Sequence, residues 1–418
     1  MLPGRVMIKK VNHIAVQINS WLLPLLALSL PVSTSAVTVL ACLILLLWAM
    51  SGEYGGKLKE IFRNEVCVAV LVYLALHVLG LLWTKDIAAG LDMLAKQWKL
   101  LLLPVFLTAL PPGLRRRTLY FFLTGLTLML VTTYLAWLDL FHFGGVTPEH
   151  PTRRLFHVVY NPMLAFGCYL VLHEVLWGTA ASWRRAGLAA LAAAMGMNMF
   201  ITEGRAGQLA FFVLLILLIF QHFRKNISKA LLVVGIAVPL LFAGGYSLSP
   251  TFQQRMDAIH HEISTFASNP NTSIGLRLLF WRNSWEIIRM HPLAGVGTGD
   301  FQRAYGWVNM KSSPRMVVTD NPHNQYILVL CQFGLMGLAA LLAIFFLQVR
   351  AALQSRDDLQ RLRLALPVLF LTIMLTESYL IVYETGFFFS LFSAVLFKRG
   401  EVPAGQGTGR LAGGEEAP

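Results

Sequence analysis

The chain of 418 residues is 56% hydrophobic and only 13% charged, with a mean hydropathy of +0.62. Soluble domains carry about 25% charged residues, so this composition excludes a soluble globular protein and indicates a polytopic membrane protein. The net charge of +13 does not indicate nucleic-acid binding, because basic residues in so apolar a chain anchor cytoplasmic segments to anionic lipids.

Twelve apolar runs follow one another along the chain, and each is a candidate transmembrane helix of ~20 residues or somewhat fewer. They span about 14–31, 36–50, 65–83, 98–110, 118–140, 158–177, 186–201, 207–221, 230–248, 324–349, 364–382 and 385–397. The sequence therefore predicts an all-α fold with about 12 transmembrane helices, helices 1–9 within residues 1–248 and helices 10–12 within 324–398.

The start of the chain also resembles a secretory signal sequence. Arg5, Lys9 and Lys10 precede the first apolar run, and Ser-Thr-Ser-Ala at 33–36 resembles a cleavage site. A second apolar run begins at Val37, directly after that sequence. This favours an uncleaved first transmembrane helix.

Lys and Arg residues are distributed unequally between the two sides of the membrane. Twenty-one of the 34 lie on the side of the termini and 13 on the other side, seven of these within 249–323. Because basic residues concentrate in cytoplasmic segments, both termini are predicted to be cytoplasmic. Residues 249–323 then form one large loop outside the cytoplasm, and the Gly- and Glu-rich tail 399–418 is predicted to be a disordered cytoplasmic segment.

The large loop is predicted to contain two helices, at 252–267 and 276–291. In the second, Arg277, Trp281 and Trp285 recur at helical spacing and share one face. An amphipathic helix with two tryptophans and several cations is typical of a helix that lies at a membrane interface.

Two arginines outside the cytoplasm stand in settings that favour anion binding. Arg205 lies in Thr-Glu-Gly-Arg-Ala-Gly (202–207), where glycines permit close backbone approach and the planar guanidinium matches phosphate oxygens. Arg277 begins the second loop helix on its tryptophan-bearing face, where a charge without an anionic partner is costly. The alternatives are an interfacial anchor or an ion pair with Glu203 for Arg205, and a snorkelling charge for Arg277.

A titratable group stands at the entrance to the tenth apolar run. His323 lies in Asn-Pro-His-Asn-Gln-Tyr (321–326). A neutral imidazole near pH 7 can accept a proton from a hydroxyl group, and a neighbouring Asn can orient the ring. The alternative is a histidine that caps the start of a helix.

Other motifs do not indicate a cofactor or a metal. Gly-Val-Gly-Thr-Gly at 295–299 lacks the preceding strand and the Lys-Ser/Thr of a nucleotide-binding loop, and it fits a tight turn. The carboxylates of the outer segments are scattered. The four cysteines lie in apolar runs without CxxC spacing. No cofactor and no metal site are therefore expected.

The ordered set of motifs between about 200 and 330 resembles the O-antigen ligase and O-antigen polymerase superfamily. The motifs are Thr202-Glu203-Gly204-Arg205, Gly275-Leu276-Arg277 with Trp281, the segment 291–301 (His-Pro-Leu-Ala-Gly-Val-Gly-Thr-Gly-Asp-Phe) and Pro322-His323-Asn324-Gln325-Tyr326. One departure is Gly204, where relatives often have Ser. The topology of about 12 helices with one late outer loop extends the resemblance over nearly the whole chain.

The resemblance implies a glycosyltransferase of the bacterial inner membrane, with a periplasmic active site. It implies transfer of an O-antigen glycan from undecaprenyl pyrophosphate to the lipid A-core oligosaccharide, in lipopolysaccharide assembly, with inversion and without a metal. Arg205 and Arg277 would neutralise the pyrophosphate, and His323 would act as the general base. Further contacts with the substrates are expected from Asn324, Tyr326, Arg282, Arg153 and Arg154, although Arg282 also fits a solvated polar face.

Within the same superfamily, O-antigen polymerases and protein O-oligosaccharyltransferases are the alternatives to a lipid A-core ligase. The oligosaccharyltransferases usually carry additional C-terminal periplasmic sequence, and this chain stops soon after its twelfth run, so a ligase is the expectation. A flippase or exporter of lipid-linked glycans is a rival from another class. It requires charges along a path through the bilayer and often repeated halves, whereas the candidate functional cations here lie in the outer segments, few ionisable residues lie within the apolar runs and no repeat is visible.

Overall fold

The computed structural model describes the chain except for residues 1–2, 143–144, 153–156, 267 and 399–418. The described residues form helices and connecting segments without any strand, which confirms the all-α prediction. The predicted disordered tail lies outside the described residues. The helices are α1 (Pro3–Ser29), α2 (Thr34–Met50), α3 (Tyr54–Arg63), α4 (Glu65–Leu79), η1 (Gly80–Leu82), α5 (Ile87–Lys96), α6 (Leu102–Ala109), η2 (Pro112–Leu114), α7 (Arg115–Trp137), α8 (His157–Trp177), α9 (Ser182–Ile201), α10 (Arg205–His222), α11 (Ile227–Leu248), α12 (Pro250–Ser264), α13 (Ser273–Met290), α14 (Phe301–Ser312), α15 (Gln325–Gln354), α16 (Gln360–Ile373) and α17 (Tyr383–Phe397).

Six helical segments in the described part of the chain are long and apolar enough to cross a membrane. They are α4 with η1, α7, α8, α10, α11 and α15, and the bent pair α2 and α3 passes the same test as a seventh. The presence of about 12 transmembrane helices therefore stays a prediction. Several predicted runs form shorter helices, such as α6 with 8 residues and α17 with 15.

The prediction of a single helix over residues 364–382 is wrong. Helix α16 ends at Ile373, and an irregular segment continues to α17. Part of this segment is buried, as at Tyr379 and Leu380. The Tyr379 hydroxyl donates to a carbonyl oxygen of α8 at 3.1 Å, and the Leu380 N–H donates to a side chain of α15 at 3.1 Å. Non-helical backbone inside a membrane protein is tolerated where the surrounding protein satisfies its polar groups.

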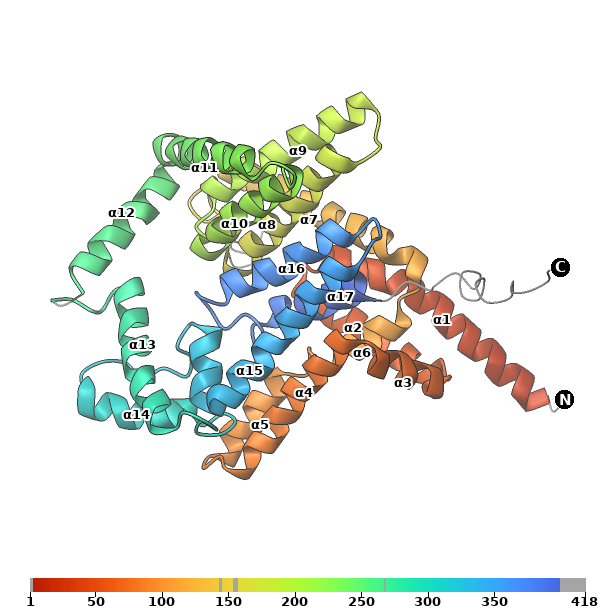
Figure 1. Cartoon of the computed structure of the whole chain (residues 1–418), viewed down its shortest axis with the longest axis horizontal. Helices are drawn as coiled ribbons and strands as arrows, with labels where there is room; N and C mark the ends of the chain where they lie inside the picture. The colour runs from red at the N-terminus through yellow and green to blue at the C-terminus, as the bar shows by residue number, and fades with distance from the viewer. Residues whose placement is uncertain (1–2, 143–144, 153–156, 267, 399–418) are drawn as a thin grey trace, which may run out of the picture.

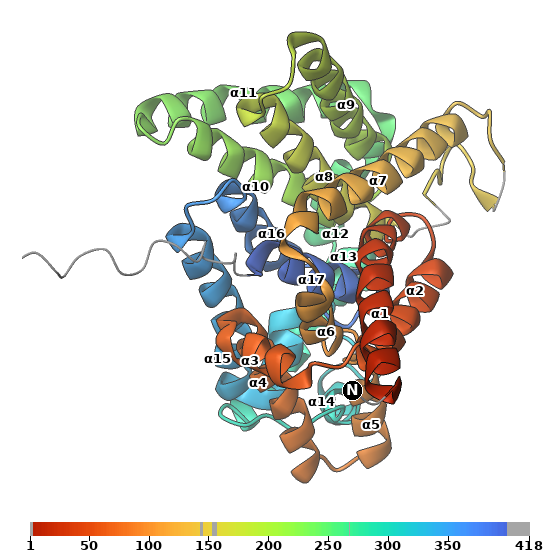
Figure 2. The ribbon, with the colours of Figure 1, turned by 90° about the vertical axis from the view of Figure 1, so that its right-hand side faces the viewer.

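The helices pack around α8 and α17, the most enclosed elements. Every residue of 159–171 in α8 and of 385–397 in α17 is buried. Phe166 of α8 meets Phe388 of α17 edge to face, with ring centroids 5.3 Å apart. By contrast only 6% of the apolar window of α11 is buried, and α11 lies at the upper edge in Figure 1. The turned view in Figure 2 shows α9, α10 and α11 grouped above α16 and α17, with α3, α4 and α15 below.

The glycine-rich segment 295–299 is a turn, as predicted. Gly295, Gly297 and Gly299 all have positive φ, of 65°, 101° and 78°, a backbone conformation that glycine adopts without a steric penalty. The segment docks where α15 is broken at Gly334 (φ 60°), and the carbonyl oxygen of Pro292 accepts the N–H that follows this glycine at 2.8 Å. The segment between α13 and α14 is thereby anchored to a helix that is long and apolar enough to span a membrane.

Three helices occupy the large loop, at the left of Figure 1. Helices α12 and α13 confirm the two predicted helices to within a few residues, and α14 was not predicted. Trp281 of α13 is half-buried and packs against the cluster formed with α14 and α15, whereas Trp285 is 57% exposed. The predicted tryptophan-bearing face of α13 is therefore divided between protein contact and exposed surface.

Candidate active site

A cavity of about 100 Å³ lies where α8, α10, α12, α13 and the irregular segment after α16 meet. Two of the predicted catalytic residues, Arg205 and Arg277, line it together. The other lining residues are His157, Val158, Glu203, Gly204, Ala206, Arg255, Ser273, Thr376, Glu377 and Tyr379. The structure thus brings together side chains that are more than 70 positions apart in the sequence.

The turn that carries Arg205 is held tightly against α8. Helix α9 ends at Ile201 and α10 begins at Arg205. The Thr202 hydroxyl donates to Asn161 Oδ1 at 3.0 Å, and a Cβ added at Gly204 would lie 2.6 Å from Asn161 Nδ2. The glycine therefore permits a close approach, and its neighbour is a side chain of α8.

The cations that line the cavity are only partly neutralised. Arg205 is 18% exposed, and its Nη2 lies 3.7 Å from Glu262 Oε1. Its buried Nε has no hydrogen-bond partner among the described residues. Arg255 Nη2 lies 2.6 Å from Glu203 Oε1, whereas Arg277 forms no ion pair within the described part of the chain. Because buried polar groups are normally hydrogen-bonded, the unpaired Nε of Arg205, with Arg277 lining the same cavity, makes this a candidate anion-binding site.

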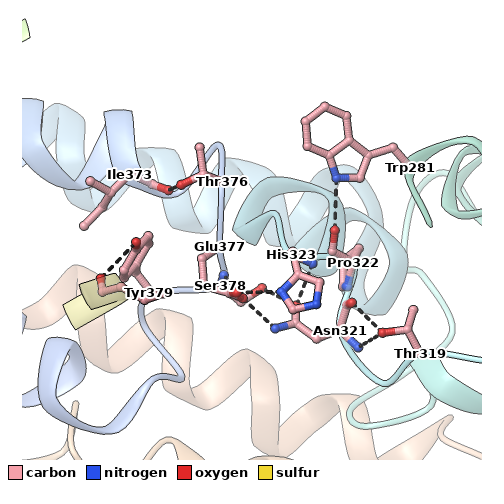
Figure 3. Close-up of polar contacts among 11 residues, drawn as sticks. Trp281, Thr319, Asn321, Pro322, His323, Ile373, Thr376, Glu377, Ser378 and Tyr379 are labelled. Carbon is pink, nitrogen blue, oxygen red and sulfur yellow. Dashed lines mark hydrogen bonds and ion pairs between the residues drawn. The ribbon is translucent and has the colours of Figure 1, made fainter. Parts of the chain in front are cut away.

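His323 does not line the cavity itself but bonds to a residue that does. Its Nδ1 lies 2.5 Å from Oε2 of Glu377, with the two side chains 37% and 13% exposed. Figure 3 shows the imidazole directed at this carboxylate. The backbone of His323 has a φ of +51°, which is uncommon outside glycine. Such strained positions cluster at functional sites, and Asn321 Oδ1 supports this one by accepting the His323 N–H at 3.0 Å.

The sequence interpretation missed Glu377. Burial alone would raise the pKa of this carboxyl group, but the hydrogen bond from His323, with further donors from Ser378 and Asn321, holds its pKa below the ordinary value. Glu377 lies within the run 364–382, whose apolar pattern predicts a single helix. An ionisable residue inside such a run is itself a sign of function, and this signal was available in the sequence.

Helix α13 connects the cationic wall to His323. Trp281 stands one turn after Arg277, and its indole N–H donates to the carbonyl oxygen of Pro322 at 3.0 Å. The preceding residue, Phe280, stacks on the His323 ring with centroids 6.1 Å apart. A single helix therefore positions one arginine of the cavity and the segment that carries the imidazole.

Of the remaining predicted substrate-binding residues, the three that the structure describes do not line the cavity. Asn324 caps α15, since its Oδ1 accepts two N–H groups of the first turn and its Nδ2 donates to a backbone carbonyl before Glu377. The Tyr326 hydroxyl donates to a carbonyl of α16 at 2.7 Å, and Arg282 is exposed on α13. Arg153 and Arg154 lie outside the described residues. Substrate contacts by these five residues stay predictions.

Residues 190–342 match the family model described as O-antigen ligase. The segment contains Arg205, Arg277 and His323, and the match confirms the resemblance of the chain to the O-antigen ligase superfamily. This superfamily implies a glycosyltransferase-like enzyme that acts on lipid-linked glycans in a membrane, in agreement with the apolar helices of a multi-pass membrane protein. A search of curated proteins gives no match to this chain.

Proposed function

We propose that the protein is an O-antigen ligase that transfers a glycan from undecaprenyl pyrophosphate to a hydroxyl group of the lipid A-core oligosaccharide. The observation that carries the proposal is the cavity that gathers Arg205 and Arg277 beside the His323–Glu377 pair. Glycosyl transfer from a lipid pyrophosphate to a hydroxyl requires two things of the enzyme. It must stabilise the charge of the departing pyrophosphate, and it must accept the proton of the hydroxyl.

The cationic wall is assigned to the donor. The bond between the anomeric carbon and the pyrophosphate breaks during transfer, and negative charge grows on the departing oxygen. Preplaced guanidinium groups stabilise that charge electrostatically, and their planar fork fits phosphate oxygens. The unpaired Nε of Arg205 and the guanidinium of Arg277 are assigned to this contact.

His323 is assigned to the acceptor. Its Nε2 would accept the proton of the attacking hydroxyl while the oxygen bonds to the anomeric carbon on the face opposite to the pyrophosphate, which inverts the configuration. No group of three or more His, Cys, Asp or Glu in the described part of the chain is placed to hold a metal ion. The proposal therefore assigns the neutralisation of the pyrophosphate to arginine.

The proposal includes a location in the bacterial inner membrane, with both termini cytoplasmic. Residues 1–248 and 324–398 would hold the transmembrane helices, and 249–323 would form the periplasmic loop. Reporter fusions test this orientation, with Pro270 and Lys311 expected to be periplasmic and Arg116 and Arg356 cytoplasmic. A cytoplasmic Pro270 would separate the site from a periplasmic acceptor and would overturn the proposal.

The decisive experiment supplies the purified full-length protein with an undecaprenyl-pyrophosphate-linked glycan. Transfer to lipid A-core is expected in the presence of that acceptor. Elongation of the glycan with donor alone would instead identify a polymerase, and transfer to a protein hydroxyl would identify an oligosaccharyltransferase. The absence of any transfer would overturn the assignment as a glycosyltransferase.

A further inference from the structure

Glu377 is a carboxylate enclosed by protein donors. It lies in the irregular segment between α16 and α17 and is 13% exposed. Its Oε2 meets His323 Nδ1 at 2.5 Å, and its Oε1 accepts Asn321 Nδ2 at 2.7 Å and the backbone N–H of Ser378 at 2.8 Å. Since both oxygens accept hydrogen bonds, the ionised carboxylate is the form that fits this site.

The donors around Glu377 are themselves fixed. Asn321 Oδ1 accepts the Ser378 hydroxyl at 2.8 Å and the His323 N–H at 3.0 Å. The Thr319 hydroxyl donates to the carbonyl oxygen of Asn321 at 2.7 Å, as Figure 3 shows. The result is a closed network that joins the start of α15 to the segment after α16 and leaves Glu377 one orientation.

The network determines which nitrogen of His323 carries the proton. A carboxylate only accepts hydrogen bonds, so Nδ1 must donate to it and carries the hydrogen. The neutral imidazole then has its lone pair on Nε2, which has no hydrogen-bond partner among the described residues. We infer that Glu377 is the positioning residue that holds His323 in this tautomer, an inference that rests on the proposed function of His323 as the base.

The transfer step balances with this arrangement. The acceptor hydroxyl gives its proton to Nε2, its oxygen bonds to the anomeric carbon, and the electron pair of the broken carbon–oxygen bond leaves with the pyrophosphate. His323 becomes an imidazolium whose Nδ1–H still donates to Glu377, so the carboxylate stabilises the charge that forms. The imidazolium then releases its proton to water.

Glu377 also lines the cavity of Arg205 and Arg277, which makes it a rival candidate for the base. As a base it would become a neutral acid, which would weaken the charge-assisted hydrogen bonds that it accepts from His323, Asn321 and Ser378. His323 Nε2 accepts a proton without losing any contact in the network. The contacts therefore favour a positioning role for the carboxylate.

The first test reads the tautomer of His323 without requiring activity. The full-length protein, labelled with ¹⁵N-histidine in lipid nanodiscs, is studied by NMR at a pH where His323 is neutral. Its signals are identified by their loss in His323→Asn. Hydrogen on Nδ1 is expected in the wild type. In Glu377→Gln the amide can donate to Nδ1, so hydrogen on Nε2 is expected.

The second test separates this inference from the proposed function. Glu377→Gln is expected to lower transfer by about 10²–10⁴-fold, the usual contribution of general base catalysis, because the wrong tautomer of the histidine cannot act as the base, as when the carboxylate of a Ser-His-Asp triad becomes an amide. Affinity for the undecaprenyl-pyrophosphate donor should remain near that of the wild type. Glu384→Gln is the matched control, because its carboxylate accepts the Thr34 hydroxyl at 2.8 Å, away from His323.

The outcomes are distinguishable. Absence of transfer by the wild-type protein would overturn the proposed function. The NMR experiment would still show whether Glu377 determines the tautomer of His323. Hydrogen on Nε2 in the wild type overturns the inference whatever the Glu377 variant shows. So does an active wild type with Glu377→Gln at the same rate, or a slower Glu377→Gln whose loss lies wholly in donor affinity.

Discussion

The two sides of the site differ in how far the protein satisfies its own polar groups. On the cationic side, Arg205 has a free Nε and an ion pair of 3.7 Å, and Arg277 has no ion pair within the described residues. On the other side, His323 and Glu377 belong to a closed network with contacts of 2.5–3.0 Å. We interpret this difference as a cationic side that a ligand would complete and a His323–Glu377 side that the fold itself organises.

This difference has an energetic reason. A charge that is partly removed from water without a partner destabilises the fold, and a bound pyrophosphate would offset that cost in the ground state as well as in the transition state. The His323–Glu377 network already compensates its own burial, so a substrate adds little binding energy there. Substitutions on the cationic side are therefore expected to change both affinity and rate, and substitutions on the other side mainly the rate.

The largest effect is expected for His323→Asn. Asparagine tolerates the positive φ at this position, so the fold should be retained, but its amide cannot act as a base. Transfer should fall by about 10²–10⁴-fold, the usual contribution of general base catalysis, while donor affinity stays near the wild-type value. Initial rates and donor titrations on protein with an unchanged melting temperature measure this. Transfer at the wild-type rate would return His323 to a structural role.

Arg277→Lys is expected to have the next largest effect. Lysine keeps the charge but loses the fork that spans two phosphate oxygens. A charge-assisted hydrogen bond contributes about 1.5–3 kcal/mol, so donor affinity and turnover together should fall by about 10- to 100-fold. The same reasoning applies to Arg205→Lys.

The matched control is Arg289→Lys on the same helix, where the guanidinium is exposed and pairs with Glu286 at 3.6 Å. It should leave transfer unchanged. If Arg277→Lys lowers the rate without lowering the affinity for the undecaprenyl-pyrophosphate donor, the predicted contrast between the two sides of the site is wrong.

A smaller effect is expected where the two sides are joined. Trp281→Phe removes the hydrogen bond to Pro322 but keeps the ring packing of α13. A neutral hydrogen bond contributes about 1 kcal/mol, so turnover should fall about fivefold. Trp285→Phe is the control, because Trp285 is 57% exposed. Equal rates for both variants would show that α13 does not couple the arginine to the imidazole.

The residues that could be predicted from the sequence share a local signal. Arg205, Arg277 and His323 stand in short motifs whose residue types indicate anion binding or proton transfer. The turn at 295–299 was predictable for the same reason, since its glycines meet a local backbone requirement. Local chemistry thus identified the two arginines that now line one cavity.

What could not be predicted depends on contacts between distant segments. Glu377 is 54 positions from His323, and its role follows from a helix that ends at Ile373 inside an apolar run. Helix α14 has mixed polarity and gives no clear periodicity, and it is stabilised by packing on α13. The break of α15 at Gly334 depends on the docking of the 292–299 segment, which no local pattern contains.

The smallest effect is expected from chelation. If Arg205 and Arg277 neutralise the pyrophosphate, the site needs no divalent cation, and transfer should continue at its normal rate after dialysis against EDTA. The described residues contain no cluster of three or more His, Cys, Asp or Glu that could replace the arginines with a metal site. Initial rates with EDTA, and with added Mg²⁺ or Mn²⁺, measure this. If EDTA abolishes transfer and Mg²⁺ or Mn²⁺ restores it, a metal ion neutralises the leaving group. The unpaired Nε of Arg205 would then need another explanation, and the division of the site into a ligand-completed side and a fold-organised side would no longer hold.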